Sequence, residues 1–306
     1  MDRRYNVIVI GGGPGGYSAA LYCVRAGLST LVLEKLSAGG QMATTTTVDN
    51  YPGFNEGVDG FELGERMQRG AERFGAVTEY AEVTALELGA RPRRVITTSG
   101  VFESDAVIIA TGAEPKELGL EGESSLRGRG VSYCATCDGM FFRGKTVAVA
   151  GGGNTAVADA LTLSGFCSKV YLIHRRDELR ASKVYMEPIA QAGNIELVLN
   201  TAIEGIVYDK SVTGLKLKNK NSGEQYQLPI DGVFVAIGRD PDTALVKGQL
   251  ELDESGYIAA GEDCRTSVPG VFAVGDVRTK PLRQIVTAAA DGANAAISAE
   301  EYIHTL

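Results

Sequence analysis

Cysteines, prolines and long hydrophobic runs are all scarce in this sequence of 306 residues. Five cysteines are too few for the disulfide framework of a small secreted protein, and an odd number cannot all pair within one chain. The apolar run at Val7–Ile10 breaks at Gly11, too early for the hydrophobic region of a signal peptide. No stretch reaches the roughly 18 apolar residues that a membrane span requires. These absences favour a cytoplasmic protein that is not bound to a membrane.

Basic residues are also in deficit. The 30 Lys and Arg residues against 38 Asp and Glu residues give a net charge of -8, the wrong sign for a general nucleic-acid binder or a polybasic membrane-surface protein. Hydrophobic residues make up 44% and charged residues 22%, which excludes disorder driven by low hydrophobicity. At roughly 150 residues per domain, the length predicts about two domains. Small molecules or proteins are the expected partners.

Glycine, in contrast, is abundant: 39 glycines are nearly double the usual share of about 7%. Several lie in VIVIGGGPGGYSAALYCVRAGLSTLVLEK, residues 7–35. There an apolar run meets a Gly-rich turn, a helical pattern that ends at Gly27, and a second apolar run that ends on Glu34. This order predicts a βαβ unit. Glu34 is placed to accept a ribose hydroxyl of a bound dinucleotide.

Three glycines give this turn its expected function. Gly11 allows the tight turn, Gly13 lets a pyrophosphate approach the backbone, and Gly16 lets helix and strand pack closely. The phosphates would then lie at the N-terminus of the helix. The sequence therefore predicts a dinucleotide site in this first unit.

The same pattern repeats as VAVAGGGNTAVADALTLSGFCSKVYLIHRR, with Gly151, Gly153 and Ala156 in the three fingerprint positions. His174 stands where Glu34 stood, and it is followed by an arginine cluster of Arg175, Arg176 and Arg180. Guanidinium groups match phosphate oxygens, so the second site is predicted to prefer a ribose with a 2′-phosphate, which means NADP(H). The alternative is a solvated basic face.

Each half ends in a similar strand and turn, DAVIIATGAEP (105–115) and DGVFVAIGRDP (231–241). Gly112 and Gly238 follow these strands, either to let a cofactor approach or for purely conformational reasons. Near the C-terminus, a strand at Val271–Val274 and a helix from about Arg283 are expected to return to the first domain. The predicted fold is therefore α/β, with two Rossmann-like three-layer nucleotide-binding domains. The second (114–243) is inserted into the first (1–113 and 244–306).

Cys134 and Cys137 lie three residues apart in CATCDG. Such a pair can close a redox disulfide, and the arrangement lowers a thiol pKa towards about 7. Half of a zinc site is the alternative, but Cys23, Cys167 and Cys264 are scattered singly and provide no second pair. No metal site is therefore predicted, and these three cysteines are expected to be spectators.

Asp138 directly follows the second cysteine of the pair. Its carboxyl group could shuttle the proton that thiol–disulfide exchange requires, or it could serve as a turn residue before Gly139.

Together these motifs resemble the low-molecular-weight, NADPH-dependent thioredoxin reductases, from about Tyr5 to the last helix. The resemblance rests on GGGPGG, GGQMATTTTVDNYPG, IIATGA, CATCDG, GGGNTAV, HRRDELRAS and FAVGDVRTKPLRQ. It implies FAD in the first unit, NADPH in the second, thioredoxin as protein substrate, and a homodimer. Met140 stands where this family commonly has Phe, while Phe141 and Phe142 are retained as apolar anchors.

The resemblance also assigns residues. Cys137 would be the flavin-proximal sulfur, Cys134 the sulfur that exchanges with thioredoxin, and Asp138 the general acid. The implied FAD contacts are Gly11, Gly13, Pro14, Gly16, Glu34, Lys35, Gly40, Gln41, Asn50, Val83, Ala110, Thr111, Gly112, Gly275, Asp276, Arg283, Gln284 and Ile285. The implied NADPH contacts are Gly151, Gly153, Asn154, Thr155, Ala156, His174, Arg175, Arg176, Arg180, Ile237 and Gly238.

The implied reaction is thioredoxin-disulfide reduction, in which electrons pass from NADPH through FAD and the cysteine pair to thioredoxin. The nicotinamide site and the cysteine pair both belong to the inserted domain, yet each must reach the same flavin. The two cannot occupy that place at the same time. That domain is therefore expected to rotate on segments near Glu114–Glu117 and Pro241–Leu245.

Three other functions fit parts of the pattern. Two are flavoproteins that reduce a peroxiredoxin-linked module or oxidise a small dithiol. The first is disfavoured because no thioredoxin-like segment precedes the first fingerprint, and the second because HRRDELR is intact. The third is a redox sensor of the NADPH/NADP⁺ ratio, which would not need both a flavin and an adjacent dithiol.

Overall fold

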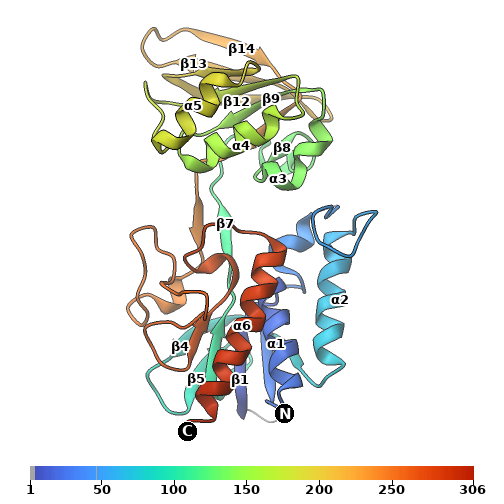
Figure 1. Ribbon diagram of the computed structural model, residues 1–306, viewed down its shortest axis with the longest axis vertical. Coiled ribbons are helices and arrows are strands. Elements are labelled where there is room, and N and C mark those ends of the chain that lie inside the picture. Colours follow the sequence, from blue (N-terminus) through green and yellow to red (C-terminus); the bar gives the residue numbers. More distant parts are fainter. Residues whose placement is uncertain (1–3, 46) are drawn as a thin grey trace. The chain divides into compact units, whose positions relative to one another are not determined.

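The computed structural model describes residues 4–45 and 47–306; Thr46, within the GGQMATTTTVDNYPG motif, lies outside them. The chain divides into two compact units (Figure 1). The first comprises Met1–Glu114 and Asp240–Leu306, and the second comprises Pro115–Arg239. The chain leaves the first unit once and later returns to it. The predicted fold class, two Rossmann-like units with the second inserted into the first, is confirmed.

A seven-stranded sheet forms the centre of the first unit. Its order is β3-β2-β1-β6-β5-β4, and β17 pairs with β6. The pairs among β1, β2, β3, β6 and β17 are parallel, whereas β4, β5 and the long β6 form an antiparallel meander. Because β17 pairs with β6, the C-terminal tail completes the first sheet, as predicted. The strands are β1 (Arg4–Ile10), β2 (Thr30–Glu34), β3 (Val77–Tyr80), β4 (Val83–Glu87), β5 (Arg93–Thr97), β6 (Gly100–Ile109) and β17 (Val271–Ala273).

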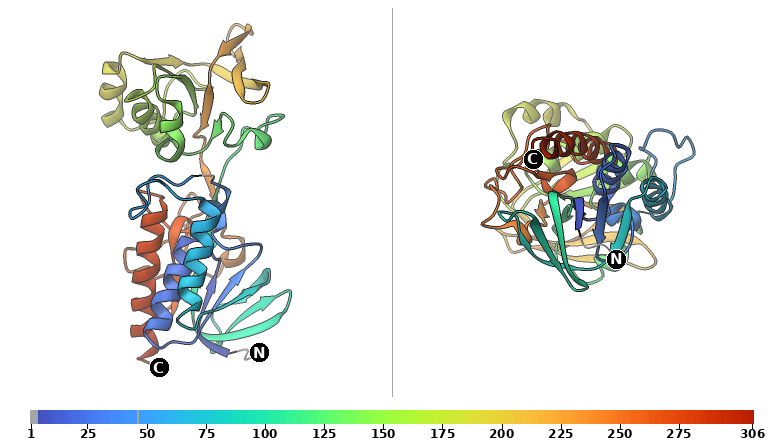
Figure 2. Two further views of the ribbon diagram at one scale, coloured as in Figure 1. Left: turned by 90° about the vertical axis from the view of Figure 1, so that its right-hand side faces the viewer. Right: turned by 90° about the horizontal axis from the view of Figure 1, so that it is seen from below.

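Three helices cover one face of this sheet (Figure 2): α1 (Pro14–Arg25), α2 (Gly60–Glu72) and α6 (Ile285–Ile303). Val7 and Val9 of β1 pack into the core under the helices, while Ile8 and Ile10 pack into a second core on the opposite face. A strand buried on both faces has no polar alternation, which explains the unbroken apolar run in the sequence.

Small residues bring α1 and α6 close together. A Cβ atom at Gly292 of α6 would collide with the carbonyl oxygen of Gly15 on α1, and one at Gly15 would lie 3.2 Å from the carbonyl oxygen of Ala288. The Ala-rich C-terminal helix therefore packs against α1 through a face of small residues.

The second unit repeats the three-layer plan. Its parallel sheet has the order β11-β10-β9-β15-β8, and β12-β13-β14 form a separate antiparallel sheet. The valines of β9 pack with α4, while its alanines pack towards the antiparallel sheet. The elements are β8 (Val131–Ser132), α3 (Ala135–Asp138), β9 (Thr146–Ala150), α4 (Asn154–Ser164), β10 (Lys169–Ile173), α5 (Met186–Gln191), β11 (Ile195–Val198), β12 (Thr201–Tyr208), β13 (Val212–Asn219), β14 (Gln225–Pro229) and β15 (Gly232–Val235).

Two short strands, β7 (Ala113–Pro115) and β16 (Arg239–Pro241), connect the units and pair as a two-stranded sheet. Single 3-10 turns complete the chain at η1 (Gly40–Thr44), η2 (Ser124–Leu126), η3 (Gly139–Phe142), η4 (Lys183–Tyr185), η5 (Ala244–Val246) and η6 (Gly275–Val277). Within the described residues, no helix combines the length and the apolar character of a membrane span.

Candidate functional site

The first glycine turn forms a cradle at the N-terminus of α1. Gly11 has a φ of +104°, and a Cβ atom there would collide with the carbonyl oxygen of Ala110. A Cβ atom at Gly16 would collide with the carbonyl oxygen of Gly11, so only glycine allows this approach of helix and strand. At Gly13 a Cβ atom would meet nothing within 4 Å. The first amides of α1 therefore border open space, which fits a pyrophosphate.

Glu34, at the end of β2, is held against this turn. Its Oε2 accepts a hydrogen bond from the Gly12 amide at 2.7 Å, and its Oε1 accepts one from the Leu36 amide at 3.0 Å. A carboxylate has lone pairs left for ribose hydroxyl groups after these two bonds. The side chain of the next residue, Lys35, has a different kind of partner. Its ammonium group forms an exposed ion pair with Glu82 at 2.7 Å.

Other residues implied by the family resemblance are tied to the same end of the sheet. Gln41 Nε2 donates to the carbonyl oxygen of Ala113 at 2.7 Å, and Thr111 Oγ1 donates to that of Asp242 at 2.6 Å. A Cβ atom at Gly40 would lie 3.5 Å from Gly13 Cα. Three more lie at the ends of elements: Pro14 begins α1, Val83 begins β4, and Gly112 lies between β6 and β7.

The C-terminal segment completes this region of the first unit. A Cβ atom at Gly15 would lie 3.6 Å from the amide nitrogen of Gly275, so η6 lies against the first turn of α1. Asn50 Nδ2 donates to Gln284 Oε1 at 2.9 Å, which joins two residues 234 positions apart. Asp276 lies in η6, and Ile285 begins α6.

Arg283 is folded back onto its own unit. Its guanidinium carbon lies 4.0 Å from the centre of the Tyr257 ring, a cation–π contact. Its Nε also donates to the carbonyl oxygen of Asp276 at 3.4 Å. The arginine that the resemblance assigns to the flavin is therefore held by an aromatic residue that sequence reasoning did not select.

The second glycine turn has the same geometry at α4. Gly151 has a φ of +152°, and a Cβ atom there would collide with the carbonyl oxygen of Ala236 and lie 2.7 Å from Ala156 Cβ. A Cβ atom at Gly153 would meet nothing within 4 Å. Asn154 and Thr155 begin the helix above this open space. The second unit therefore also fits a nucleotide phosphate at a helix N-terminus.

His174 is buried beside this turn and is 6% exposed. A Cβ atom at Gly152 would collide with its ring, and its Nε2 is a buried atom without a hydrogen-bond partner in the described chain. Burial lowers the pKa of His174, and the charges of Arg180, Arg176 and Arg175 lower it further. His174 is therefore neutral near pH 7, and the positive charge of this region comes from the arginines alone.

The arginine cluster, Arg175, Arg176 and Arg180, is exposed. The loop that carries it folds back on α4, because the Arg180 amide donates to the carbonyl oxygen of Gly152 at 2.7 Å. The Ser182 amide likewise donates to Asn154 Oδ1 at 2.7 Å. Across residues 4–45 and 47–306, no ion pair engages the three guanidinium groups. Ile237, 42% exposed, and Gly238, with a φ of +120°, follow β15 in the same unit.

The cysteine pair lies at the start of α3 in the second unit, with Cys134 as its N-cap and Cys137 within it. Cys134 and Cys137 form a disulfide, and both side chains are half-buried. The Cys134 amide donates to Ser132 Oγ at 3.1 Å, and the Cys137 amide donates to the carbonyl oxygen of Cys134 at 3.2 Å. A Cβ atom at Gly139 would lie 2.8 Å from the Phe166 ring, so the disulfide turn packs against the chain that follows α4.

Asp138 is linked to the same serine. Ser132 Oγ donates to Asp138 Oδ2 at 2.6 Å. Burial raises the pKa of Asp138 above its ordinary value, and the hydrogen bond from Ser132 opposes this rise. A carboxyl group with a raised pKa stays protonated to a higher pH than an ordinary one, which suits it to donate a proton. Sequence reasoning missed Ser132, because a serine two residues before a cysteine has no signature of its own.

The three residues that follow the CATCDG motif differ in exposure. Met140 and Phe141 are each 53% exposed. Phe142 is buried, and its ring packs edge-on against that of Phe234 with 5.3 Å between centroids. Phe141 and Met140 therefore form the exposed apolar surface beside the disulfide, and Phe142 belongs to the core.

The other three cysteines, which are expected to be spectators, are buried and free. Burial raises the pKa of Cys23 and Cys264 to about 12 and that of Cys167 to about 11. Thiols with such pKa values are poor nucleophiles at neutral pH. In the described part of the chain, no group of three or more His, Cys, Asp or Glu residues is arranged to hold a metal ion.

Comparison with known proteins shows the family of the chain. Residues 5–292 match the pyridine nucleotide-disulphide oxidoreductase family. The thioredoxin reductase of Streptomyces coelicolor is 46% identical, over 100% of this chain and 96% of the relative. Among solved structures, the thioredoxin reductase of Streptococcus pyogenes superposes with a TM-score of 0.92 at 38% identity and covers 100% of both chains. That of Lactococcus lactis, described as its FR conformation, has a TM-score of 0.69 at 40% identity, over 99% of this chain and 100% of the other.

A full-length match at this identity agrees with the two glycine cradles and the disulfide found here. The chain belongs to the pyridine nucleotide-disulphide oxidoreductases and, among them, to the thioredoxin reductase family.

Proposed function

We propose that this protein is a thioredoxin-disulfide reductase that moves electrons from NADPH to oxidised thioredoxin, with FAD and the Cys134–Cys137 disulfide as its redox groups. FAD and NADPH are the cofactors of the family to which the chain belongs. The observation that carries the proposal is the second unit itself. It combines a nucleotide cradle, arginines that form no ion pair with the described residues, and a half-buried disulfide followed by a carboxyl group of raised pKa.

The residues of the first unit suit FAD. The turn from Gly11 to Gly16 would bind the pyrophosphate, and Glu34 would accept hydrogen bonds from the ribose. Asp276, Arg283 and Gln284 would face the rest of the cofactor. When bound, FAD supplies a two-electron relay between a nicotinamide and a disulfide. In the second unit, the arginine cluster would bind the 2′-phosphate of NADPH through charge-assisted hydrogen bonds.

The chemistry at the cysteines starts from the reduced dithiol. The Cys134 thiolate attacks the disulfide of thioredoxin, forms a mixed disulfide and releases one thioredoxin sulfur as a thiolate. Cys137 then attacks Cys134, which re-forms the Cys134–Cys137 disulfide and releases the second thioredoxin sulfur. Two electrons thus pass to thioredoxin, and its two thiolates each take up a proton. Asp138 would donate one of these protons.

The test is anaerobic NADPH consumption by the purified protein with oxidised thioredoxin, run beside NADH. Rapid NADPH oxidation that depends on thioredoxin supports the proposal. If NADPH bleaches the flavin absorbance but thioredoxin does not restore it, another disulfide is the substrate, as in the small-dithiol or sensor alternatives. If NADPH does not bleach the flavin, NADPH is not the electron donor.

Asp138→Asn is expected to slow thioredoxin reduction by roughly 10² to 10⁴-fold, the usual contribution of a general acid. In the wild type, the rate should fall as the pH rises through the pKa of Asp138, because only the protonated carboxyl donates. The raised pKa places this fall at a higher pH than for an ordinary carboxyl group. The pH profile of thioredoxin turnover measures it, and the Asn variant should lack this limb.

Ser132→Ala provides the matched control for Asp138. The hydrogen bond from Ser132 favours the charged carboxylate, so its loss should raise the pKa of Asp138 and move the alkaline limb to higher pH. If the rate falls at the same alkaline pH in Asp138→Asn and in Ser132→Ala as in the wild type, a group other than Asp138 titrates there.

Rotation of the second unit between half-reactions is part of the proposal. The nicotinamide and the cysteine pair both belong to this unit, and both must reach one flavin in turn. In support, solved thioredoxin reductases of nearly equal identity to this chain give TM-scores of 0.92 and 0.69 over its full length. This spread is expected if relatives differ in how their two units are placed. A covalent crosslink between the units should therefore stop turnover; turnover that continues in the crosslinked protein contradicts rotation.

We also propose a cytoplasmic homodimer, on family grounds. Three free thiols are typical of a protein in a reducing compartment. Sedimentation of the purified protein should give twice the mass of the chain, and a monomer at micromolar concentration would refute the dimer. Activity recovered outside the cytoplasmic fraction would refute the compartment.

A further inference from the structure

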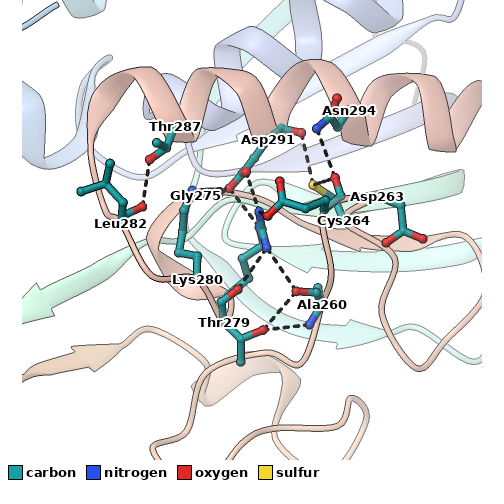
Figure 3. Close-up of polar contacts among 12 residues, drawn as sticks. Ala260, Asp263, Cys264, Gly275, Thr279, Lys280, Leu282, Thr287, Asp291 and Asn294 are labelled. Carbon is teal, nitrogen blue, oxygen red and sulfur yellow. Dashed lines mark hydrogen bonds and ion pairs between the residues drawn. The ribbon is translucent and has the colours of Figure 1, made fainter. Parts of the chain in front are cut away.

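A buried ion cluster lies in the first unit, between α6 and the segment that follows β17 (Figure 3). Asp291 of α6 accepts hydrogen bonds from Arg278 Nε at 3.0 Å, from Arg278 Nη2 at 2.7 Å and from Lys280 Nζ at 2.6 Å. The side chains of Arg278, Lys280 and Asp291 are only 2%, 3% and 4% exposed, respectively. Arg278 Nη1 also donates to the carbonyl oxygens of Ala260 and Thr279 at 3.1 and 3.0 Å.

The charges of this cluster do not balance. Burial alone would raise the pKa of Asp291, but the hydrogen bonds from Arg278 and Lys280 outweigh it and hold that pKa below its ordinary value. One anion therefore faces two cations. Glu262 also pairs with Arg278, at 3.6 Å, but its side chain is 87% exposed to solvent. Buried ions are poor contributors to net stability because of their desolvation, so stability alone does not account for an unbalanced cluster.

The cluster holds the segment from Gly275 to Arg283 at both ends. At one end, the Gly275 amide donates to Asp291 Oδ2 at 2.8 Å, directly before Asp276. Gly275 has a φ of +73°, so only a residue that tolerates this backbone can present its amide there. At the other end, Arg283 Nη2 donates to the carbonyl oxygen of Arg278 at 3.3 Å.

We infer that the Arg278–Asp291–Lys280 cluster is a positioning element of the flavin site, which fixes the segment that carries Asp276 and Arg283. The inference rests on the proposed function, because that function assigns these two residues to FAD. The cluster also adds one buried positive charge to the region of the first unit that would hold the cofactor. A positive charge stabilises the added negative charge of a reduced flavin.

Lys280→Met tests both consequences and leaves the two hydrogen bonds between Arg278 and Asp291 in place. We expect FAD to bind about tenfold more weakly, the equivalent of one lost charge-assisted hydrogen bond. The midpoint potential of the remaining bound flavin should become more negative, because one positive charge is lost. FAD affinity is measured by titrating the apoprotein, and the potential by equilibration with redox dyes. NADP⁺ affinity, a property of the second unit, should not change.

Arg265→Met is the matched control. Arg265 belongs to the same unit, but its ion pairs with Glu301 and Asp263 are exposed, so FAD affinity and potential should stay within about twofold of the wild type. If Lys280→Met does not fold, Lys280→Gln, whose amide can still donate to Asp291, is measured instead.

The outcomes separate this inference from the proposed function. A folded Lys280 variant with wild-type FAD affinity and potential overturns the positioning role. A variant that only loses thermal stability, with both FAD properties unchanged, also overturns it and leaves a structural role. A wild-type protein that binds no FAD refutes the proposed function itself.

Discussion

Cys134→Ser is expected to reduce the rate of thioredoxin reduction by at least about a thousandfold, because a serine hydroxyl group forms neither a thiolate nor a disulfide. Bleaching of the flavin absorbance by NADPH should stay near the wild-type rate, because that step does not use Cys134. Anaerobic stopped-flow absorbance measures the flavin, and NADPH consumption with oxidised thioredoxin measures turnover.

Cys137→Ser distinguishes the roles of the two sulfurs. Cys134 remains as the attacking thiol, but no neighbour resolves its mixed disulfide, so the variant should trap thioredoxin in a covalent complex visible on a non-reducing gel. If Cys134→Ser traps thioredoxin and Cys137→Ser does not, the two roles are exchanged. Cys167→Ala is the matched control, since this thiol is buried in the same unit with a pKa of about 11. It should leave both rates unchanged.

The elements of the sequence that carry local signals were predictable. The run VIVI, the glycine turn and the following helical pattern are neighbours along the chain, so a short window contains the whole βαβ signal. The disulfide of Cys134 and Cys137 is local in the same sense, because the two residues lie one helical turn apart. The insertion could be predicted because the first fingerprint needed a late strand, and β17 supplies it.

Contacts between distant segments were not predictable. In the repeat, His174 occupies the position of Glu34 and is expected to contact NADPH, but the burial of its ring beneath Gly152 depends on the packing of β9 and β10. Likewise, Phe142 and Phe141 are adjacent in sequence, and Phe142 is buried because its ring packs against Phe234 and the rest of the core of the second unit. A single apolar pattern cannot separate an exposed aromatic from a buried one.

Asp291 shows the same limit in the buried cluster. The sequence offers one signal for Asp291: it is a carboxylate in an Ala-rich helix, on a face otherwise made of small residues. Its partners, Arg278 and Lys280, lie 13 and 11 residues away in a loop with no periodic pattern. The cluster therefore emerges only from the fold, although each residue is visible in the sequence.

Arg175→Ala should raise the Michaelis constant for NADPH by about ten- to hundredfold, because a charge-assisted hydrogen bond to phosphate contributes about 1.5 to 3 kcal/mol. The Michaelis constant for NADH should hardly change, because NADH has no 2′-phosphate for the guanidinium group to bind. Steady-state kinetics with each nucleotide at saturating thioredoxin measures the two constants. Arg176→Ala and Arg180→Ala are expected to act in the same direction, since their guanidinium groups also lack ion-pair partners in the described chain.

Lys218→Ala is the matched control for the arginine cluster. It removes one positive charge from the same unit, but Lys218 lies on β13, where it pairs with Glu204 at 3.4 Å. Its effect on NADPH should be within the small range of an exposed ion pair. An equal loss of affinity for NADPH and NADH in Arg175→Ala would contradict the phosphate role and support a basic face that acts on both nucleotides alike. A loss confined to NADPH that shrinks at high salt, where exposed charges are screened, would identify the cluster as the site of nucleotide selection.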